Sequence, residues 1–286
     1  MTAKADFHNH STASDGRLSP TQLVDLAAAN GVRILALSDH DSTEGIAEAR
    51  RAAERHEGLF LVPGVELSTD IAGDEVHILG YFTYETLLNQ DLQAELANFR
   101  AGRFERGRLM TEKLAAIGIP ISWERVLEIA GEASVGRPHV ALALVEAGHV
   151  SNVNEAFDRY IGRDGPAYVD REKMTPRQAI EALRRYGSPA VLAHPRYVKD
   201  LEGVLPEMVD AGLAGMEVYY KDSDEALIAQ MAATAKRFGL SPLGGSDYHA
   251  LPRPDEREPG NIPLPDSIAR DFLERHLPWV PTRALI

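Results

Sequence analysis

Seven short apolar or β-rich runs, each ending in polar residues, constrain what this chain can fold into. They span residues 5–10, 34–40, 59–66, 76–82, 189–194, 216–220 and 242–249. Runs of this length and composition predict β-strands. Segments with helical spacing lie between most of them, and strands that alternate with helices predict an α/β fold with a parallel sheet. Seven such strands can close into a distorted (β/α)7 barrel, which is a (β/α)8 barrel that lacks one strand.

Two of the intervening helices carry explicit start signals. Ser19-Pro20-Thr21-Gln22 and Thr175-Pro176-Arg177-Gln178 each combine a capping hydroxyl, a proline at the first helical position and a glutamine three residues after the cap. Gly31 and Gly187 stand where the two helices should end. Helices are therefore expected to begin at Pro20 and Pro176.

The alternation of strands and helices stops between about residues 98 and 170. Helical patterns follow one another there at residues 100–117, 122–130, 138–147 and 154–160. A βα loop usually has about 2 to 6 residues, so this stretch is too long to be a simple connection. We expect a helical insertion over 98–170 that caps one face of a barrel built from residues 1–97 and 171–286.

Composition limits the classes of site that the chain can carry. Because the 286 residues include no cysteine, thiolate nucleophiles, disulfides and sulfur-bound zinc are excluded. No run of about 18 apolar residues is present, and residues 1–6 lack the apolar core of a signal peptide. We expect a cytoplasmic protein with no membrane partner. The net charge of −13 argues against broad binding to duplex nucleic acid, which needs many basic residues on one face.

Nine residues that can bind a metal lie at the ends of the apolar runs, and they include six of the ten histidines. They are His8, His10, Asp15, His40, Glu66, His77, His194, Asp247 and His249. Any one of them alone could be structural, because polar residues commonly end strands and cap helices. As a set they predict a pocket, since the carboxyl ends of barrel strands converge on one mouth.

Nitrogen and oxygen ligands without sulfur suit manganese, iron or zinc, and nine ligands are too many for one ion. We therefore expect two or three divalent ions, with manganese favoured. A hydroxide shared by two ions is a nucleophile at neutral pH, and the ions also neutralise the oxygens of a phosphoryl group. Hydrolysis of a phosphate ester fits this pocket best.

Seven motifs together resemble the PHP (polymerase and histidinol phosphatase) family of metal-dependent phosphoesterases. They are Asp6-Phe7-His8-Asn9-His10-Ser11, Ser14-Asp15-Gly16, Ser38-Asp39-His40-Asp41, Gly64-Val65-Glu66, Val76-His77, Ala193-His194-Pro195 and Gly245-Ser246-Asp247-Tyr248-His249. The resemblance implies a distorted (β/α)7 barrel with a trinuclear site. It assigns one ion to His8, His10, Glu66 and Asp247, a second to Glu66, His77 and His194, and a third to Asp15, His40 and His249.

In that assignment Glu66 bridges two ions, and with its partners it would hold the attacking hydroxide. No expected ligand is missing from the chain, which favours an active enzyme over a non-catalytic PHP module. His194 is also a candidate for the acid that protonates the leaving oxygen. His139 and a metal-bound water are the alternatives to His194.

The insertion resembles that of the small-nucleotide branch, which contains 3',5'-nucleoside bisphosphate phosphatases and 5'-3' exoribonucleases. The stretch that carries this likeness runs from Ser134 through Arg137 to His139. A guanidinium, an imidazole and a helix N-terminus could together bind a phosphate. Arg196 is a further candidate, although an exposed arginine after a strand is common.

We therefore expect an enzyme that removes a phosphate from a small nucleotide. The 3'-phosphate of a nucleoside 3',5'-bisphosphate is the favoured substrate, with stepwise action from the 5' end of short single-stranded RNA as an extension. Histidinol phosphate and a cyclic sugar phosphate are the alternatives within the family. A metal-dependent amidohydrolase fits less well, because only Lys221 lies near a strand end that could supply its bridging lysine. The oligomeric state stays open.

Overall fold

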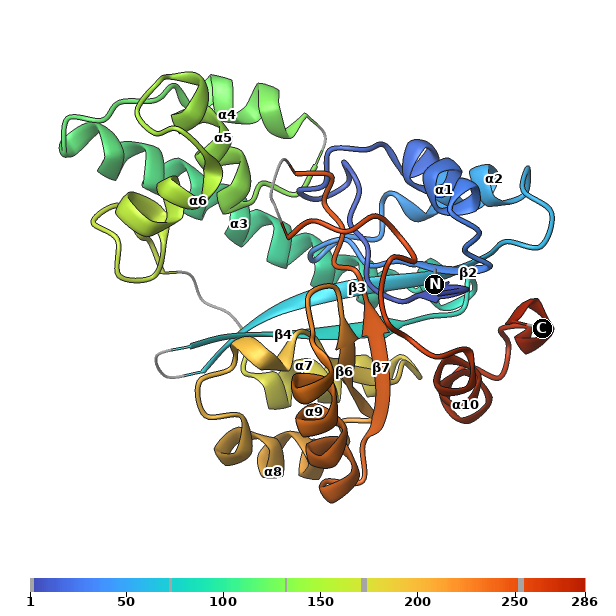
Figure 1. Cartoon of the computed structure of the whole chain (residues 1–286). Coiled ribbons are helices and arrows are strands. Elements are labelled where there is room, and N and C mark those ends of the chain that lie inside the picture. The colour runs from blue at the N-terminus through green and yellow to red at the C-terminus, as the bar shows by residue number, and fades with distance from the viewer. Residues whose placement is uncertain (1–2, 72–73, 132, 171–173, 252–254, 286) are drawn as a thin grey trace.

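A computed structural model describes residues 3–71, 74–131, 133–170, 174–251 and 255–285. Within these residues one sheet contains seven strands, which are hydrogen-bonded in sequence order from β1 to β7 (Figure 1). The strands are β1 Ala5–Asp6, β2 Ile34–Leu37, β3 Phe60–Ile71, β4 Asp74–Tyr81, β5 Ala190–Leu192, β6 Gly215–Tyr220 and β7 Ser241–Gly245. Every run expected to form a strand does so.

The sheet closes almost completely into a barrel. The backbone N–H of Phe7 donates to the carbonyl of Gly244 at 3.3 Å, and that of Asp247 donates to the carbonyl of His8 at 2.8 Å. These bonds join the last strand to the first just beyond the end of β1. The expected distorted seven-stranded α/β barrel is therefore confirmed.

The expectation of a parallel sheet is wrong for β4. β4 is antiparallel to both of its neighbours, and it forms a long hairpin with β3 in which Gly64 pairs with Tyr81 and Ile71 with Asp74. Two residues separate these strands, whereas a parallel pair needs a crossover of a dozen or more residues. The hairpin extends past the barrel, so Glu66 and His77 lie inside strands instead of at strand ends.

Five helices cover the outside of the barrel: α1 Pro20–Ala29, α2 Ile46–Ala53, α7 Pro176–Arg185, α8 Leu201–Ala211 and α9 Glu225–Arg237. A further helix, α10 Asp266–His276, lies at one end of the barrel. The two helices with start signals begin at the expected prolines. Ser19 and Thr175 both form complete capping boxes with the glutamine three residues on. Short helical turns lie at η1 Thr86–Leu88, η3 Pro195–Tyr197 and η4 Thr282–Leu285.

Alternate strand residues fill the barrel interior, and α10 seals one end of it. Phe7, Tyr81 and Phe272 meet edge to face with ring centroids 5.8 to 6.1 Å apart. Ser241, at the start of β7, hydrogen-bonds His276 of α10 at 2.8 Å. The helix therefore closes the end where the parallel strands begin, which leaves the opposite mouth for the site.

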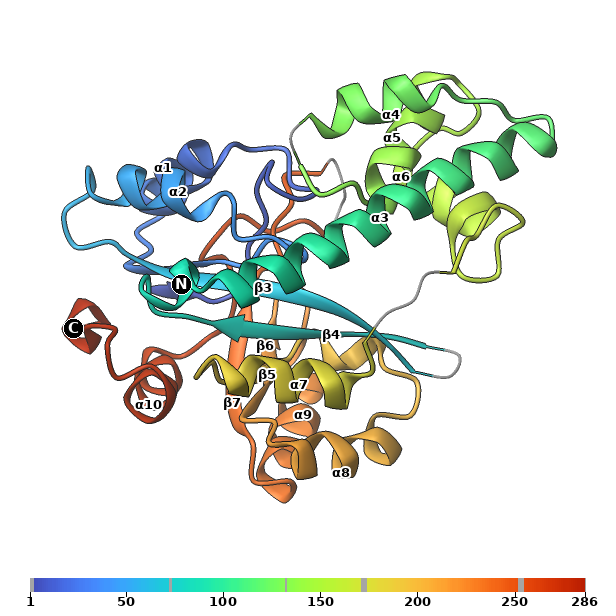
Figure 2. The same ribbon diagram turned by 180° about the vertical axis from the view of Figure 1, so that it is seen from behind.

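The segment between β4 and α7 forms a helical cap beside that mouth (Figures 1 and 2). It contains α3 Gln90–Ala116, α4 Trp123–Ala130, α5 Arg137–Glu146, α6 Val153–Ala156 and the π-helical turn η2 Phe157–Ile161. Leu92 and Leu96 of α3 pack into the barrel core, whereas Met110 and Leu114 pack into a separate core within the cap. The expected boundary at residue 98 thus falls inside one continuous helix.

Arginines of the cap meet carboxylates of the barrel. Arg100 pairs with Glu44 at 3.1 Å, and Arg103 pairs with Asp41 at 2.6 Å. Farther along the cap, two more arginines reach the β3–β4 hairpin: Arg137 pairs with Glu75 and Arg163 with Asp70. The cap is therefore attached to the barrel by α3 and by a row of ion pairs.

Candidate metal centre

The barrel mouth brings the nine expected residues together. Their nitrogen and oxygen atoms form three groups within 4.8 Å that could each hold an ion: His8, His10, Glu66 and Asp247; His10, Asp15, His40 and His249; and His40, Glu66 and His77. His194, the ninth residue, places Nε2 3.1 Å from Glu66 Oε1. Residues from both ends of the chain therefore share one pocket.

Glu66 lies at the middle of the centre and is almost fully buried. Its Oε1 lies 2.8 Å from Nδ1 of His77, and its Oε2 lies 3.0 Å from Nδ1 of His40. The same Oε2 is 3.2 Å from Nε2 of His10. One carboxylate thus faces two different sets of imidazoles, which is the arrangement that a bridging ligand requires.

The remaining carboxylates lie on either side of Glu66. Asp247 Oδ1 is 3.4 Å from His8 Nε2 and 3.2 Å from His10 Nε2. Asp15 Oδ1 is 3.3 Å from His249 Nε2. The grouping differs from the family assignment at three histidines. His10 also joins Asp15, His40 and His249, and His40 takes the place of His194 beside Glu66 and His77.

Burial and close charges shift the pKa values throughout the centre. Burial alone would raise the pKa of Asp15, Glu66 and Asp247, yet neighbouring histidines, and Lys221 beside Asp247, hold all three well below their usual range. Burial lowers the pKa of His40 to about 4, with Arg103 acting in the same direction. Burial would lower the pKa of His10 and His77 as well, but neighbouring carboxylates raise these values to about 10 and about 9. Ions that bind these two imidazoles must therefore displace protons, whereas His40 is already neutral at pH 7.

The donor set fits divalent metal ions. His40 Nδ1, Glu66 Oε2 and His77 Nε2 are buried and have no hydrogen-bond partner, although such atoms normally find one. Two of them, on His40 and Glu66, face each other at 3.0 Å. Imidazole nitrogens and carboxylate oxygens without sulfur suit manganese, iron or zinc. Bound ions would satisfy the two atoms that face each other.

Several residues that support the centre were not singled out by their sequence positions. Glu217 of β6 accepts the backbone N–H of His194 at 2.6 Å, and its other oxygen lies 3.2 Å from His8 Nδ1. Tyr220 donates to Asp247 Oδ2 at 2.6 Å. In the sequence, Glu217 is the one charged residue in the apolar run 216–220, and this position could have indicated a role inside the barrel.

Asp39 organises the loop that carries Asp15. It accepts hydrogen bonds from the backbone and hydroxyl of Ser11 at 2.8 and 2.7 Å and from the hydroxyl of Ser14 at 2.6 Å. Burial raises its pKa in spite of these bonds. Its role follows from contacts between two distant loops, so the sequence offers only its place beside His40 as a signal.

The four residues expected to bind phosphate have different surroundings. Ser134 is buried, and its hydroxyl has no partner. Arg137 contacts Glu75 at 2.5 Å and lies over the ring of Phe157. His139 Nδ1 accepts the N–H of Gly136 at 2.9 Å, so this nitrogen caps α5. Arg196 forms an ion pair with Asp222.

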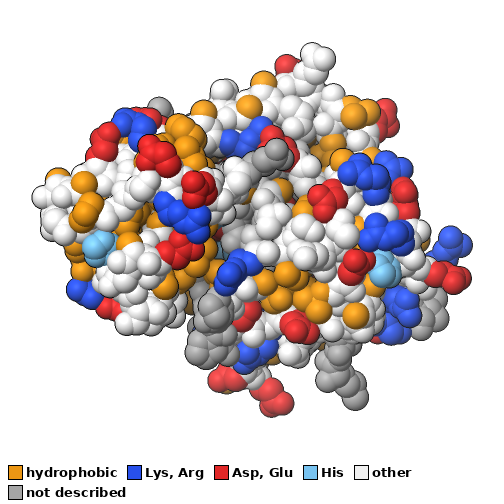
Figure 3. Space-filling view, turned by 90° about the horizontal axis from the view of Figure 1, so that it is seen from above, with side chains coloured by type: hydrophobic (Ala, Val, Ile, Leu, Met, Phe, Trp, Pro, Cys, Tyr) orange, Lys and Arg blue, Asp and Glu red, His pale blue; other side chains and the backbone are white. Residues whose placement is uncertain are grey.

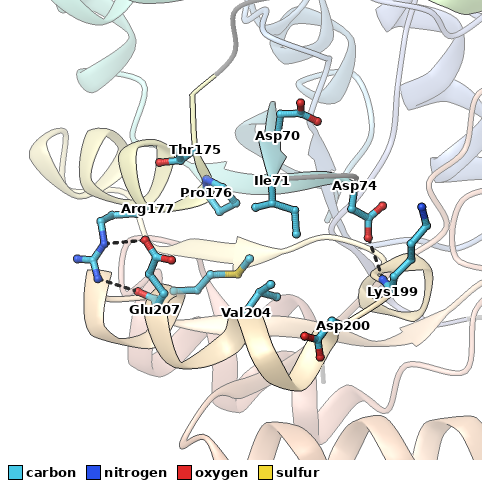
Figure 4. Close-up of a pocket in the computed structure, with 11 residues that line it drawn as sticks. Asp70, Ile71, Asp74, Thr175, Pro176, Arg177, Lys199, Asp200, Val204 and Glu207 are labelled. Atoms are coloured by element: carbon cyan, nitrogen blue, oxygen red, sulfur yellow. Dashed lines mark hydrogen bonds and ion pairs between the residues drawn. The ribbon is translucent and has the colours of Figure 1, made fainter. Parts of the chain in front are cut away.

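A cavity of about 500 Å³ lies elsewhere, beside the tip of the β3–β4 hairpin (Figure 4). Ile71, Pro176, Val204 and Met208 contribute its apolar lining, and Arg177 and Glu207 pair at its rim. None of the nine expected ligands lines it. This cavity is therefore separate from the candidate metal centre.

Seen from above, the molecule shows acidic and basic side chains interspersed over one face, with a hollow between the cap and the barrel (Figure 3). Among the residues that the structure describes, no helix is both long enough and apolar enough to cross a membrane.

Comparison with known sequences identifies relatives over most of the chain. The PHP domain model matches residues 6–240. A 5'-3' exoribonuclease from Haemophilus influenzae is 40% identical over 253 residues, which cover 87% of this chain and 91% of the relative. A 3',5'-nucleoside bisphosphate phosphatase from Chromobacterium violaceum is 35% identical over 87% of this chain and 88% of its own. A phosphoribosyl 1,2-cyclic phosphate 1,2-diphosphodiesterase from Eggerthella lenta is 34% identical over 85% and 93%.

Two solved structures share the fold. One, from Bifidobacterium adolescentis and assigned to the metal-dependent phosphoesterases, has a TM-score of 0.85 and 30% identity. The other, named an amidohydrolase from Chromobacterium violaceum and holding sulfate without metal, has a TM-score of 0.86 and 32% identity. Each alignment covers 96% of both chains. With its metal-binding groups at the barrel mouth, the chain belongs to the PHP domain family, in its phosphoesterase branch, and is a metal-dependent phosphoric ester hydrolase.

Proposed function

We propose that the chain removes a phosphate from a small nucleotide, with the 3'-phosphate of a nucleoside 3',5'-bisphosphate as the favoured substrate. Short single-stranded RNA, processed from its 5' end, is the extended substrate in this proposal. The observation that carries it is the position of Arg137, which lies on the cap and is linked through Glu75 to His77 of the centre. A second phosphate of the substrate could be bound there while the first is hydrolysed.

The proposal assigns two or three divalent ions, with manganese favoured, to the nine residues of the centre. Such ions supply a hydroxide nucleophile and neutralise the phosphoryl oxygens when they are bound. Glu66 keeps its two oxygens directed at different groups of histidines, and Asp247 is fixed by the hydroxyl of Tyr220. These contacts hold the ligand atoms in position before substrate arrives.

Ser134 and Arg137 belong to the proposed phosphate site, and the geometry gives His139 a different part within it. Because Nδ1 of His139 accepts the Gly136 N–H, this imidazole fixes the loop that contains Ser134 and Arg137. Arg196 would have to leave Asp222 in order to bind a substrate. His194, with Nε2 next to Glu66, is better placed as a metal ligand than as a proton donor.

A cyclic sugar phosphate is the second candidate substrate, because the relative from Eggerthella lenta carries that activity in its name. The amidohydrolase alternative has little structural support. Lys221 binds the backbone carbonyl of Asp247 at 3.1 Å and lies 3.6 Å from its carboxylate, so it does not bridge the ligand groups. The proposal also includes a cytoplasmic location and no duplex nucleic acid as partner.

A substrate panel tests the proposal directly. Phosphate release would be measured, with manganese added, from a nucleoside 3',5'-bisphosphate, a short RNA, histidinol phosphate, a cyclic ribose phosphate and an aryl phosphate. We expect the first two to give the highest kcat/KM. Asp247→Ala should remove turnover and lower the bound metal, as measured by elemental analysis. Equal use of all substrates by the wild type would reject the nucleotide assignment, and full activity of the variant would reject the centre.

A further inference from the structure

Glu75 lies between the metal centre and the cap. It is two residues before His77 in β4, so both side chains project from the same face of the strand. Its Oε1 is 3.6 Å from Nε2 of His77, and its Oε2 is 2.5 Å from the guanidinium of Arg137. One carboxylate therefore contacts both a candidate ligand and the candidate phosphate-binding arginine.

Positive charge surrounds this carboxylate. Arg103 and Arg163 are also close enough for Glu75 to influence them electrostatically. The Arg137 guanidinium lies 5.4 Å from the ring centroid of Phe157, which supports it from another side. Arg137 is thus held in place, with only about 16% of its side chain exposed. A substrate anion that uses this guanidinium must compete with Glu75 for it.

We propose that Glu75 is a specificity-determining residue that admits a terminal phosphate monoester to Arg137 and rejects anions of lower charge. This inference rests on the proposed function, in which Arg137 binds the substrate's second phosphate. A phosphate monoester carries a charge of about −1.5 to −2 at pH 7 and offers three acceptor oxygens. A monoester can therefore displace the Glu75 carboxylate, of charge −1, from the Arg137 guanidinium. A phosphodiester also carries a charge of −1, so replacing the carboxylate with it gains little.

The selection would favour the free end of a nucleotide over an internal linkage. A bisphosphate, or an RNA with a 5'-phosphate, presents a monoester to Arg137. An internal position presents only a diester, and the Arg137–Glu75 pair then stays closed. Glu75 would in this way restrict hydrolysis to small substrates and chain ends.

The β3–β4 hairpin offers a matched control. Asp70 pairs directly opposite Glu75 in the antiparallel register, so the two carboxylates lie on one face. Asp70 also binds a cap arginine, Arg163, and the exposed fractions of the Asp70 and Glu75 side chains are 23% and 20%. Asp70→Asn therefore removes an equivalent link between cap and hairpin without touching the Arg137 pair.

The test compares a nucleoside 3',5'-bisphosphate with its 5'-methyl ester, which differs by one charge and one methyl group. We expect the wild type to prefer the bisphosphate and Glu75→Gln to reduce that preference roughly fivefold, through a lower KM for the ester, since the freed guanidinium accepts either anion. Because Glu75 also contacts His77, each variant is assayed at saturating manganese, and the preference is taken as the ratio of the two kcat/KM values on the same enzyme. Asp70→Asn should keep the wild-type preference, and Glu75→Gln should have no effect on it in an Arg137→Ala background.

Calorimetric titration of the bisphosphate into chelated protein gives a readout that is independent of turnover, and we expect tighter binding in Glu75→Gln. The role of Glu75 would be overturned if Glu75→Gln kept the wild-type preference or showed a higher KM for the methyl ester. The same change of preference in Asp70→Asn would also overturn it. A loss of metal in Glu75→Gln together with an unchanged preference would show instead that the residue only supports His77. The proposed substrate fails if the wild type hydrolyses the aryl phosphate but does not prefer the bisphosphate. In that case Glu75 is rejected as a selector if Glu75→Gln also binds the bisphosphate no more tightly than the wild type does in the chelated protein.

Discussion

Single residues at the centre adopt backbone conformations that their types rarely adopt. Asp41, His194, Asp247 and Ala250 have φ values of 51°, 29°, 48° and 57°, and they are the described non-glycine residues with positive φ. Each is a candidate ligand or directly follows one. Such conformations cost about 1 to 3 kcal/mol each and persist where the surrounding structure enforces them. Here the enforcing contacts include the bond from the His194 N–H to Glu217.

Glu217→Gln is predicted to weaken metal binding more than it weakens the fold. The glutamine amide cannot serve both as the charged partner of His8 Nδ1 and as the acceptor for His194. Loss of such outer partners typically lowers metal affinity about 10- to 100-fold. Competition with a chromophoric chelator measures the affinity, with Glu217→Asp as the charge-preserving control. Wild-type affinity in the glutamine variant would contradict this role.

Local sequence signals fix where the helices α1 and α7 begin, whereas long-range strand pairing fixes the direction of β4 in the β3–β4 hairpin. The capping boxes at Ser19 and Thr175 depend on residues three apart, so they were visible in the sequence. The antiparallel direction of β4 depends on its pairing with β3 and β5. The runs ending at Glu66 and beginning at Val76 are separated by fewer residues than a parallel crossover needs, so their spacing indicates an antiparallel pair.

Thr175→Ala should destabilise the protein by about 1 kcal/mol through loss of the α7 cap. The Thr175 hydroxyl accepts the N–H of Gln178 at 3.3 Å, and alanine cannot form this bond. Urea unfolding followed by circular dichroism measures the change. Thr175→Ser retains the hydroxyl and should stay close to wild type, and an equal loss in both variants would show that the methyl group matters instead.

The whole molecule consists of a barrel and a cap with separate apolar cores, joined by α3 and by ion pairs. The centre lies at the junction and collects carboxylates and histidines from loops far apart in the chain. Without bound ions, the negative charges of these buried carboxylates are balanced only by nearby protonated histidines and basic side chains. Metal binding should therefore stabilise the folded state as a whole.

Removing metal by chelation is predicted to lower Tm by several degrees, and adding manganese should restore it. A ligand present at 100 times its Kd stabilises the folded state by about 2.7 kcal/mol. Differential scanning fluorimetry measures the shift, and Asp247→Ala, which removes one candidate ligand, should show a smaller one. An identical Tm with and without manganese would argue against ions at these residues.

Hydrophobic periodicity, capping and ligand type are local properties, so the sequence predicts the seven strands, the two capped helices and the nine candidate ligands. How these parts meet depends on the folded structure. It reversed β4, extended α3 from one core into the other, gave His139 a capping role, and placed Glu217 and Glu75 against His8 and His77. The contact between Glu217 and His8 joins residues from opposite ends of the chain, and only the closed barrel brings them within reach.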